Sequence, residues 1–232
     1  PGRAREADRS AERAPSAPSR VASIRSPHRR SPHRSQPMAG ELLTEFLEVA
    51  IHVILFERKV YPEDIFTRQR AFGVPVTMSR HPDVNAYIKK VLGDARPLFD
   101  ARAVESLVVA VTDGGGEPRE RFVFDVGLGG GAAPSPEAVE ATEYAMRALL
   151  AKLAVARGDL PPPRPDAEFR LFLHTREDPR VVAPFAASPE SGYVDARRDA
   201  AAAPLGPGFD VVPVRDVATP LAEFALRVEV AA

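Results

Sequence analysis

The chain has 232 residues, 44% of them apolar, which is enough to bury one sizeable core and predicts a single folded domain. It contains no Cys, which excludes disulfides, thiolate metal sites and Cys nucleophiles. The net charge of -1 is unevenly spread, because residues 1–37 carry a net charge of +6 and the remainder carries -7. An acidic body argues against a large nucleic-acid surface, since phosphate contacts need clustered Lys and Arg.

Residues 1–37 are rich in Arg, Ser and Pro and almost free of large apolar side chains. Such a leader cannot bury enough surface to offset its ordering entropy, so we expect it to be disordered, or to be an upstream extension before a natural start at Met38. The motif Arg-Ser-Pro-His-Arg occurs twice, and Ser26 and Ser31 within it are candidates for phosphorylation or for a basic nuclear address. The folded domain is expected over residues 38–232.

The first predicted helix runs from about Glu41 to Arg58. Its polar side chains recur at spacings of four, three and four residues and so form one stripe, made of Glu41, Glu45, Glu48 and His52. The other faces are apolar, which is typical of a helix buried in the middle of a fold. Pro62 disfavours helical backbone at Tyr61 and helps to end this element. The segment Val74-Pro75-Val76 that follows is of β type. No apolar run reaches the ~20 residues that a membrane-spanning helix needs.

A second helix is predicted to begin at His81-Pro82-Asp83, because Asp83 can cap it and Pro82 restrains the entry of the chain. The apolar side chains that follow keep a three-to-four spacing: Val84, Tyr87, Ile88, Val91 and Leu92. Tyr87 is therefore either a core aromatic with a satisfied hydroxyl or an aromatic that packs against a bound peptide. The same two interpretations apply to two further tyrosines, Tyr61 and Tyr193.

A β-hairpin is predicted next. The segment Ser106 to Val111 is a strand by its β-branched content, and Asp113-Gly114-Gly115-Gly116 supplies the residues of a turn. The return strand alternates, so that one face carries Phe122, Phe124 and Val126 and the other carries Arg121, Val123 and Asp125.

The rest of the chain predicts one more helix and three more strands. Ser135 and Pro136 are suitable for the N-cap and first position of a helix that extends to about Arg157. A strand is expected from Glu168 to Thr175, and the segment Arg176 to Gly208 is rich in Pro, Ala and Gly with little periodicity. The closing strands are Val211 to Val214 and Glu223 to Val230. The last strand has an apolar face of Phe224, Leu226 and Val228 and an exposed face of Glu223, Ala225, Arg227 and Glu229. This mixture of helices and hairpin-connected strands indicates an α+β fold.

Motifs that would indicate catalysis or cofactor binding are weak in this chain. The run Gly127 to Ala132 matches a dinucleotide fingerprint only formally, because it follows the second arm of a hairpin rather than a buried parallel strand. His81-Pro82-Asp83 also matches the tripeptide of the J-domain co-chaperones, but those domains are wholly helical. No two His of the body have metal-ligand spacing, and no nucleophile motif is present. We therefore expect no enzyme, no cofactor and no metal.

Three segments carry a family resemblance: FLEVAIHVILFERKVYPEDIFTRQRAFGVPVTMSRHPDVNAYI, ERFVFDV and LHTRE. Together they closely resemble the HORMA-domain accessory subunit of the translesion DNA polymerase zeta, the mitotic-arrest-deficient-like protein B family. The resemblance implies a mostly antiparallel sheet backed by helices, with a C-terminal safety belt at about residues 176–232. It also implies a non-catalytic nuclear adaptor in DNA damage tolerance, which traps a partner peptide under the belt by β-augmentation.

The resemblance further implies sites and partners. The partners are a proline-containing peptide of the polymerase zeta catalytic subunit, a Y-family polymerase scaffold and other HORMA proteins, with no direct nucleic acid and no membrane. The implied peptide-binding residues are Tyr87, Tyr193 and Tyr61. The implied face for HORMA dimers holds Arg147, Arg68, Lys152 and Lys59. The implied face for the scaffold polymerase holds Val211, Ala225 and Arg227.

An alternative within the same superfamily is the spindle-checkpoint protein, which uses the same belt on different peptides in mitotic control. The segments VPVTMSRHPDVNAYI and ERFVFDV favour the polymerase subunit.

Overall fold

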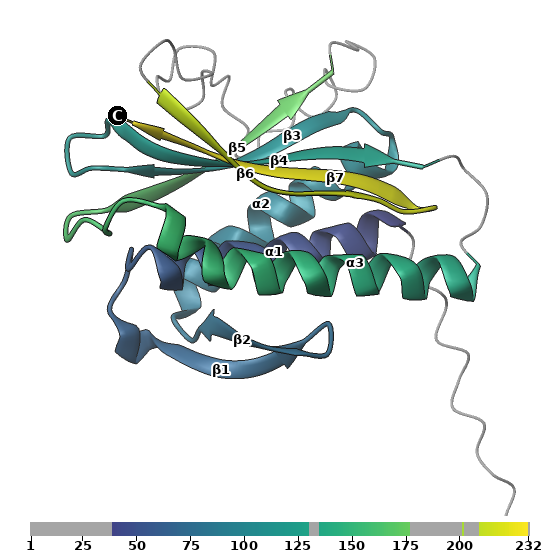
Figure 1. Cartoon of the computed structure of the whole chain (residues 1–232), viewed down its shortest axis with the longest axis horizontal. Helices are drawn as coiled ribbons and strands as arrows, with labels where there is room; N and C mark the ends of the chain where they lie inside the picture. Colours follow the sequence, from purple (N-terminus) through teal and green to yellow (C-terminus); the bar gives the residue numbers. More distant parts are fainter. Residues whose placement is uncertain (1–38, 130–134, 177–200, 202–208, 232) are drawn as a thin grey trace, which may run out of the picture. The chain divides into compact units, whose positions relative to one another are not determined.

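The computed structural model describes residues 39–129, 135–176, 201 and 209–231 (Figure 1). The predictions made for the Arg-rich leader, for Tyr193 and for most of the Pro/Ala/Gly-rich segment lie outside these residues. No helix in the described part of the chain is long and apolar enough to cross a membrane.

The main sheet has five strands in the order β5-β3-β4-β7-β6, and every neighbouring pair is antiparallel. In the middle of the sheet Val109 of β3 lies opposite Phe122 of β4 on one side and Leu171 of β5 on the other. The strands are β3 (Val104–Thr112), β4 (Pro118–Leu128), β5 (Glu168–Thr175), β6 (Phe209–Ala218) and β7 (Ala222–Ala231). The sheet order places β5 and β6 at its two edges.

Three helices cover one face of this sheet, and a second, two-stranded sheet lies on the far side of them (Figure 1). The helices are α1 (Ala39–Glu57), α2 (Pro82–Asp100) and α3 (Pro136–Val155). The small sheet is the hairpin of β1 (Phe66–Ala71) and β2 (Val74–Ser79). Two 3₁₀ turns, Glu63–Ile65 and Ala156–Asp159, complete the described elements. The α+β architecture predicted from the sequence is confirmed.

Helix α1 is apolar on most faces because it is enclosed from two sides. The ring of Phe46 lies 6.5 Å from Phe124 and 5.9 Å from Phe224 of the main sheet, and 6.0 Å from Phe72 at the turn of the small hairpin. The buried position of this helix was therefore predicted correctly. In the polar stripe Glu41, Glu45 and Glu48 are exposed or partly exposed, whereas the last member, His52, is 1% exposed. The backbone N–H of Ser79 donates to His52 Nδ1 at 3.4 Å, since β2 packs over this end of the stripe.

The β1–β2 hairpin was predicted only at its Val-Pro-Val segment. Strand β1 is polar, with the sequence Phe-Thr-Arg-Gln-Arg-Ala, and carries no apolar alternation that would mark it. The turn between the strands has positive φ at both central residues, 51° at Phe72 and 76° at Gly73. This backbone matches the twist of a two-residue hairpin, and Phe72 adopts it because its ring packs against Phe46.

Both faces of the central strands are buried. The predicted alternation on β4 places Arg121 and Val123 on the face opposite Phe122 and Phe124, and there each is about as buried as the core. Val123 belongs to a second apolar cluster on the face opposite the helices, formed with Val108, Ala110, Phe172 and Ala201. Arg121 is buried because its Nη1 donates to Glu229 at 2.6 Å, and Glu229 itself is buried rather than exposed as predicted.

Helix α3 begins as predicted. The Ser135 side chain accepts a hydrogen bond from the backbone N–H of Ala138 at 3.2 Å, and Pro136 occupies the first turn, where its missing N–H costs nothing. The helix ends at Val155, two residues before the predicted end, and tightens there into the 3₁₀ turn that contains Gly158.

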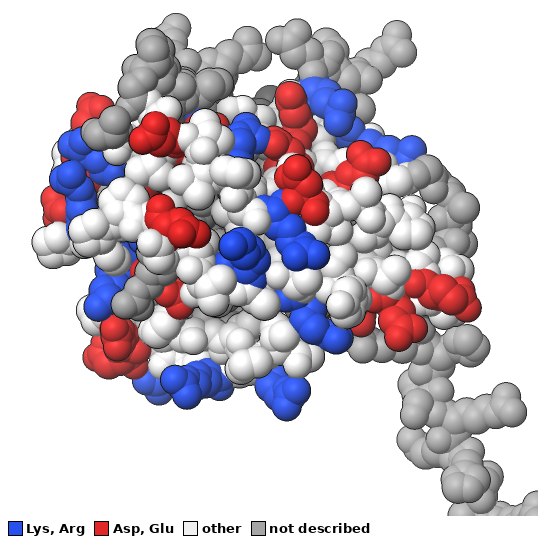
Figure 2. Space-filling view, in the orientation of Figure 1, with Lys and Arg blue, Asp and Glu red and all other residues white. Residues whose placement is uncertain are grey.

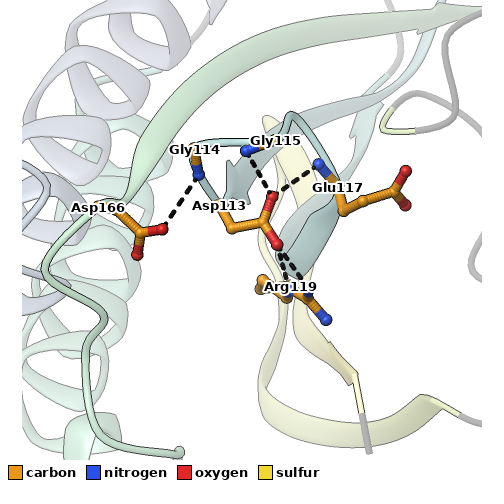
Figure 3. A network of polar contacts seen from close by, with 6 residues as sticks. All are labelled: Asp113, Gly114, Gly115, Glu117, Arg119 and Asp166. Carbon is orange, nitrogen blue, oxygen red and sulfur yellow. Dashed lines mark hydrogen bonds and ion pairs between the residues drawn. The ribbon is translucent and has the colours of Figure 1, made fainter.

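The β3–β4 loop is organised by Asp113 (Figure 3). Its carboxylate accepts hydrogen bonds from the backbone N–H groups of Gly115 at 3.0 Å and Glu117 at 3.1 Å, and from Arg119 Nε at 2.8 Å. The pKa of Asp113 is lowered below its ordinary value, mainly by the hydrogen bond from the Arg119 side chain and next by the one from the Glu117 N–H. The predicted Asp-Gly turn is thus stabilised by the Asp side chain itself.

Candidate functional site

Strand β5 is an open edge of the sheet. Its residues pair with β3 alone, and among the described residues no strand lies along its other side. An edge strand presents unpaired backbone N–H and C=O groups to whatever approaches it, so it can accept one more strand from another chain. The helix-side residues Phe169, Leu171 and Leu173 are only partly buried, although all three pack against the core. A segment added at this edge would cover them further.

An aromatic cluster stands beside this edge on the helix side. The Phe169 ring lies between two tyrosines, with its centroid 6.1 Å from Tyr61 and 5.6 Å from Tyr87, and both contacts are edge-to-face. Tyr61 follows helix α1, Tyr87 lies on α2, and Phe169 is the second residue of β5. Three separate elements therefore build one aromatic surface, of the kind that packs against proline and apolar side chains.

The two tyrosines differ in exposure. Tyr87 is 41% exposed, so part of its side chain is available to a ligand, whereas Tyr61 is half-buried. Burial is the main cause that raises the pKa of Tyr61, and the charge of Glu168 and the neighbouring Tyr87 raise it further. A neutral phenol at this position can donate a hydrogen bond to a peptide carbonyl at any physiological pH.

The sequence brought Tyr61 and Tyr87 forward as candidates, and the structure places them together. Tyr193, the third candidate, lies outside the described residues. Phe169 was not singled out, although its alternation with Leu171 and Leu173 was a usable signal for an apolar face on β5.

The residues implied for a scaffold polymerase lie at the opposite edge of the sheet. Val211 of the edge strand β6 is 59% exposed and lies opposite Glu229 of β7. Ala225 and Arg227 lie on β7, the strand next to this edge. The Arg227 guanidinium is already paired within the chain, because Nη1 pairs with Asp125 and Nε lies 3.4 Å from Glu229. Arg121 also forms an ion pair with Glu229. The two arginines and the two carboxylates together form a network without net charge across β4 and β7.

The residues implied for a dimer face are spread over three elements. Arg147 on α3 donates from Nε to the Phe72 carbonyl at 2.7 Å and lies against the β1–β2 turn. Arg68 is exposed on β1, and Figure 2 shows Lys and Arg side chains along the lower edge of the molecule, where this hairpin lies in Figure 1. Lys152 is exposed on α3, and the Lys59 ammonium lies 3.6 Å from Glu63. The structure therefore joins Arg147 to the hairpin that carries Arg68.

Metal ligands are not grouped in the described part of the chain, where no three His, Asp or Glu side chains lie close enough to hold an ion. The sheet carries a buried ion pair instead. Arg58, directly after α1, donates from Nε to Glu120 of β4 at 2.6 Å. Sequence reasoning missed this pair because its members are 62 residues apart and lie on unrelated elements.

Comparison with known sequences gives a family for this architecture. Residues 40–191 match the HORMA domain. The chain is 38% identical over 141 residues to the mitotic spindle assembly checkpoint protein MAD2B of Gallus gallus, covering 60% of this chain and 67% of that protein. It is 30% identical over 142 residues to the DNA polymerase zeta processivity subunit of Arabidopsis thaliana, covering 61% of this chain and 66% of that protein.

Solved structures share the fold at low sequence identity. A chain in the crystal structure of the Mitotic Checkpoint Complex has a TM-score of 0.70 at 22% identity, covering 84% of this chain and 99% of that one. C. elegans HTP-2 bound to HTP-3 closure motif 1 has a TM-score of 0.65 at 13% identity, covering 83% and 85%. The sequence and structural matches together show that the chain belongs to the HORMA domain family, in which it is similar to the MAD2B and DNA polymerase zeta subunit proteins.

Proposed function

We propose that this protein is a non-catalytic HORMA adaptor that captures an extended partner peptide along β5. The observation that carries the proposal is the open β5 edge with Tyr61, Phe169 and Tyr87 beside it. Backbone hydrogen bonds to the edge would supply affinity, and the aromatic surface would select proline and apolar side chains. A peptide held in this way needs no catalytic group in the adaptor.

The partner we propose is a proline-containing peptide of the catalytic subunit of DNA polymerase zeta, bound in the nucleus during translesion synthesis. The similarity to a protein named as a DNA polymerase zeta processivity subunit supports this choice. The structural neighbour HTP-2, which is bound to a closure motif, supports capture of a peptide as the mode of action.

A second candidate function is mitotic checkpoint control. It is favoured by the name of the MAD2B relatives and by the fold shared with a chain of the Mitotic Checkpoint Complex. The two functions differ in the peptide that the same edge would hold, so one binding experiment separates them.

The test is a titration of the full chain with two fluorescent peptides, one from the polymerase zeta catalytic subunit and one from a checkpoint partner. We expect saturable binding of the polymerase peptide and at least tenfold weaker binding of the other. Hydrogen exchange with the bound peptide should slow the amides of β5 on its open side, because they gain a strand partner. Binding that leaves β5 exchange unchanged would place the peptide elsewhere.

Tyr87→Ala is expected to weaken the polymerase peptide by about 1–3 kcal/mol, the range of an interface aromatic, which corresponds to about 5–150-fold in Kd. The cause is loss of the exposed ring beside Phe169. The measurement is the same titration, with the fraction of folded protein determined by urea unfolding. Tyr144→Ala is the matched control, because Tyr144 is 66% exposed on α3. Equal effects of the two changes would count against an aromatic site at β5.

A further inference from the structure

A pocket lies at the end of the sheet where β3, β4 and β7 meet the loop before β5. It is open to solvent and has a volume of about 70 Å³. One wall is the proline run 161–163, and the apolar floor includes Val111, Ala167 and Ala231. Its polar lining is made of Arg58, Thr112, Arg119, Glu120 and Arg164. The prolines have no N–H groups, so hydrogen-bond donors come to this pocket mainly from side chains.

Arg58 contributes a buried donor to which no described residue offers an acceptor. A guanidinium has five N–H donors. Arg58 uses Nε on Glu120 at 2.6 Å, and uses Nη2 on the other Glu120 oxygen and on the Pro161 carbonyl at 2.7 Å. Its Nη1 is buried and has no hydrogen-bond partner among the described residues, and the side chain is only 2% exposed. Such an atom costs free energy in the folded state unless an acceptor reaches it.

Thr112 contributes a second unpartnered group in the same lining. It is 1% exposed, and its hydroxyl is buried without a hydrogen-bond partner in the part of the chain that the structure describes. The register of β3 and β4 shifts between Val111 and Thr112, and a shift of this kind changes the direction of the side chain at the end of a strand. A hydroxyl can donate to an anionic oxygen, as the Arg58 Nη1 does.

The charge of the lining is positive. It contains three arginines and one carboxylate, Glu120, both of whose oxygens are already taken by Arg58. Arg119 is held by Asp113 beside the pocket (Figure 3), whereas Arg164 is exposed at the rim. A ligand that satisfies Arg58 and Thr112 must therefore be an acceptor, and the surplus positive charge favours an anion.

We propose that this pocket binds a small oxyanion, a phosphate or a carboxylate group, between Arg58 Nη1, the Thr112 hydroxyl and the Arg164 guanidinium. The buried donors fix the oxygens of the anion, and Arg164 closes over it from the rim. The site is separate from the aromatic surface at β5 and does not depend on a peptide being bound there.

The test is isothermal titration of the full chain with inorganic phosphate and, separately, with acetate, at an ionic strength held constant with chloride. Constant ionic strength removes general screening as a cause of any heat. We expect saturable binding with a Kd on the order of 1 mM, as suits a ligand of only a few atoms. Binding of phosphate alone would identify a phosphoryl site, and binding of acetate as well would identify a carboxylate site.

Two variants test the position of the anion. Thr112→Val keeps the shape of the side chain and removes the hydroxyl, and Arg164→Ala removes the rim cation without touching the core. Each should weaken the bound anion about tenfold, the value of one hydrogen bond to a charged group. Arg215→Ala, which removes an exposed arginine from β6, is the control and should leave the Kd within twofold. Absence of saturable binding for both anions, or equal Kd values in all four proteins, would overturn the proposal.

Discussion

Arg58→Met is expected to lower the free energy of unfolding by about 3–5 kcal/mol, the cost of leaving a buried charge without its partner. Arg58 and Glu120 have side-chain exposures of only 2% and 8%. Burial raises the pKa of Glu120 above its ordinary value, even though Arg58 and Arg164 act in the opposite direction. The carboxylate is therefore held charged chiefly by the guanidinium, and methionine keeps the aliphatic stem while removing that charge. Urea unfolding at pH 7.5 gives the measurement.

A double change separates the charge from the packing. Arg58→Met with Glu120→Leu removes both ions together, so most of the lost stability should return. About 1 kcal/mol should stay lost, because the Pro161 carbonyl no longer receives its hydrogen bond from Arg58. Lys90→Ala is a control for an ion pair in solvent. Its Nζ lies 2.9 Å from Asp94 on the exposed side of α2, where such pairs contribute about 0.3–0.5 kcal/mol.

The single and double changes can also contradict this account. If Arg58→Met cost no more than Lys90→Ala, the ion pair would contribute nothing beyond a surface pair. If the double variant were as unstable as Arg58→Met alone, the loss would come from packing around residue 58 and not from an uncompensated carboxylate.

Much of the fold could be predicted because local patterns were strong where they mattered. Helix α1 carries apolar side chains on most of its surface, and this alone indicated a central helix. The cap at Ser135 and the turn at Asp113 depend on side chains that act within four residues, so sequence spacing was sufficient. Strand β1 was missed since its residues are polar and its pairing with β2 depends on a turn with positive φ at Phe72.

The candidate sites were harder to predict, because they are made by contacts between distant parts of the chain. Tyr61 and Tyr87 were chosen through a family resemblance, and only the fold places Phe169 between them. Glu229 was assigned to solvent by alternation on β7, but a buried partner on β4 changes the cost of burying it. Alternation predicts to which face of the sheet a side chain points. It does not show whether a neighbouring strand places a side chain of opposite charge on that face.

His52 makes the stability of the protein depend on pH in the acidic range. The His52 side chain lies in the core and is 1% exposed. Its pKa is lowered from 6.5 to about 4, mainly by burial and to a smaller extent by the positive charge of Lys89. The Ser79 N–H donates to Nδ1, so this nitrogen is the unprotonated one in the neutral ring. A proton on Nδ1 would break that hydrogen bond and place a charge in the core.

The sign of the effect follows from the two protonation states. Above pH 6.5 the ring is neutral in both folded and unfolded chains, so its full contribution to stability is present. Between pH 6.5 and about 4 the unfolded chain binds a proton that the folded chain rejects, and stability falls as the pH falls. Each pH unit in this window is worth at most about 1.4 kcal/mol, so the total loss from His52 is about 3 kcal/mol.

Urea unfolding of the wild type and of His52→Asn between pH 7.5 and 4 measures this contribution. Asparagine keeps an acceptor for the Ser79 N–H and has no titrating group, so it should be less stable than the wild type at pH 7.5 and should lose about 3 kcal/mol less on acidification. His81→Asn is the control, because His81 is exposed at the start of α2 and its replacement should leave the wild-type profile unchanged. Parallel pH profiles for the wild type and His52→Asn would show that the acid sensitivity comes from the carboxylates, and that His52 does not titrate on unfolding.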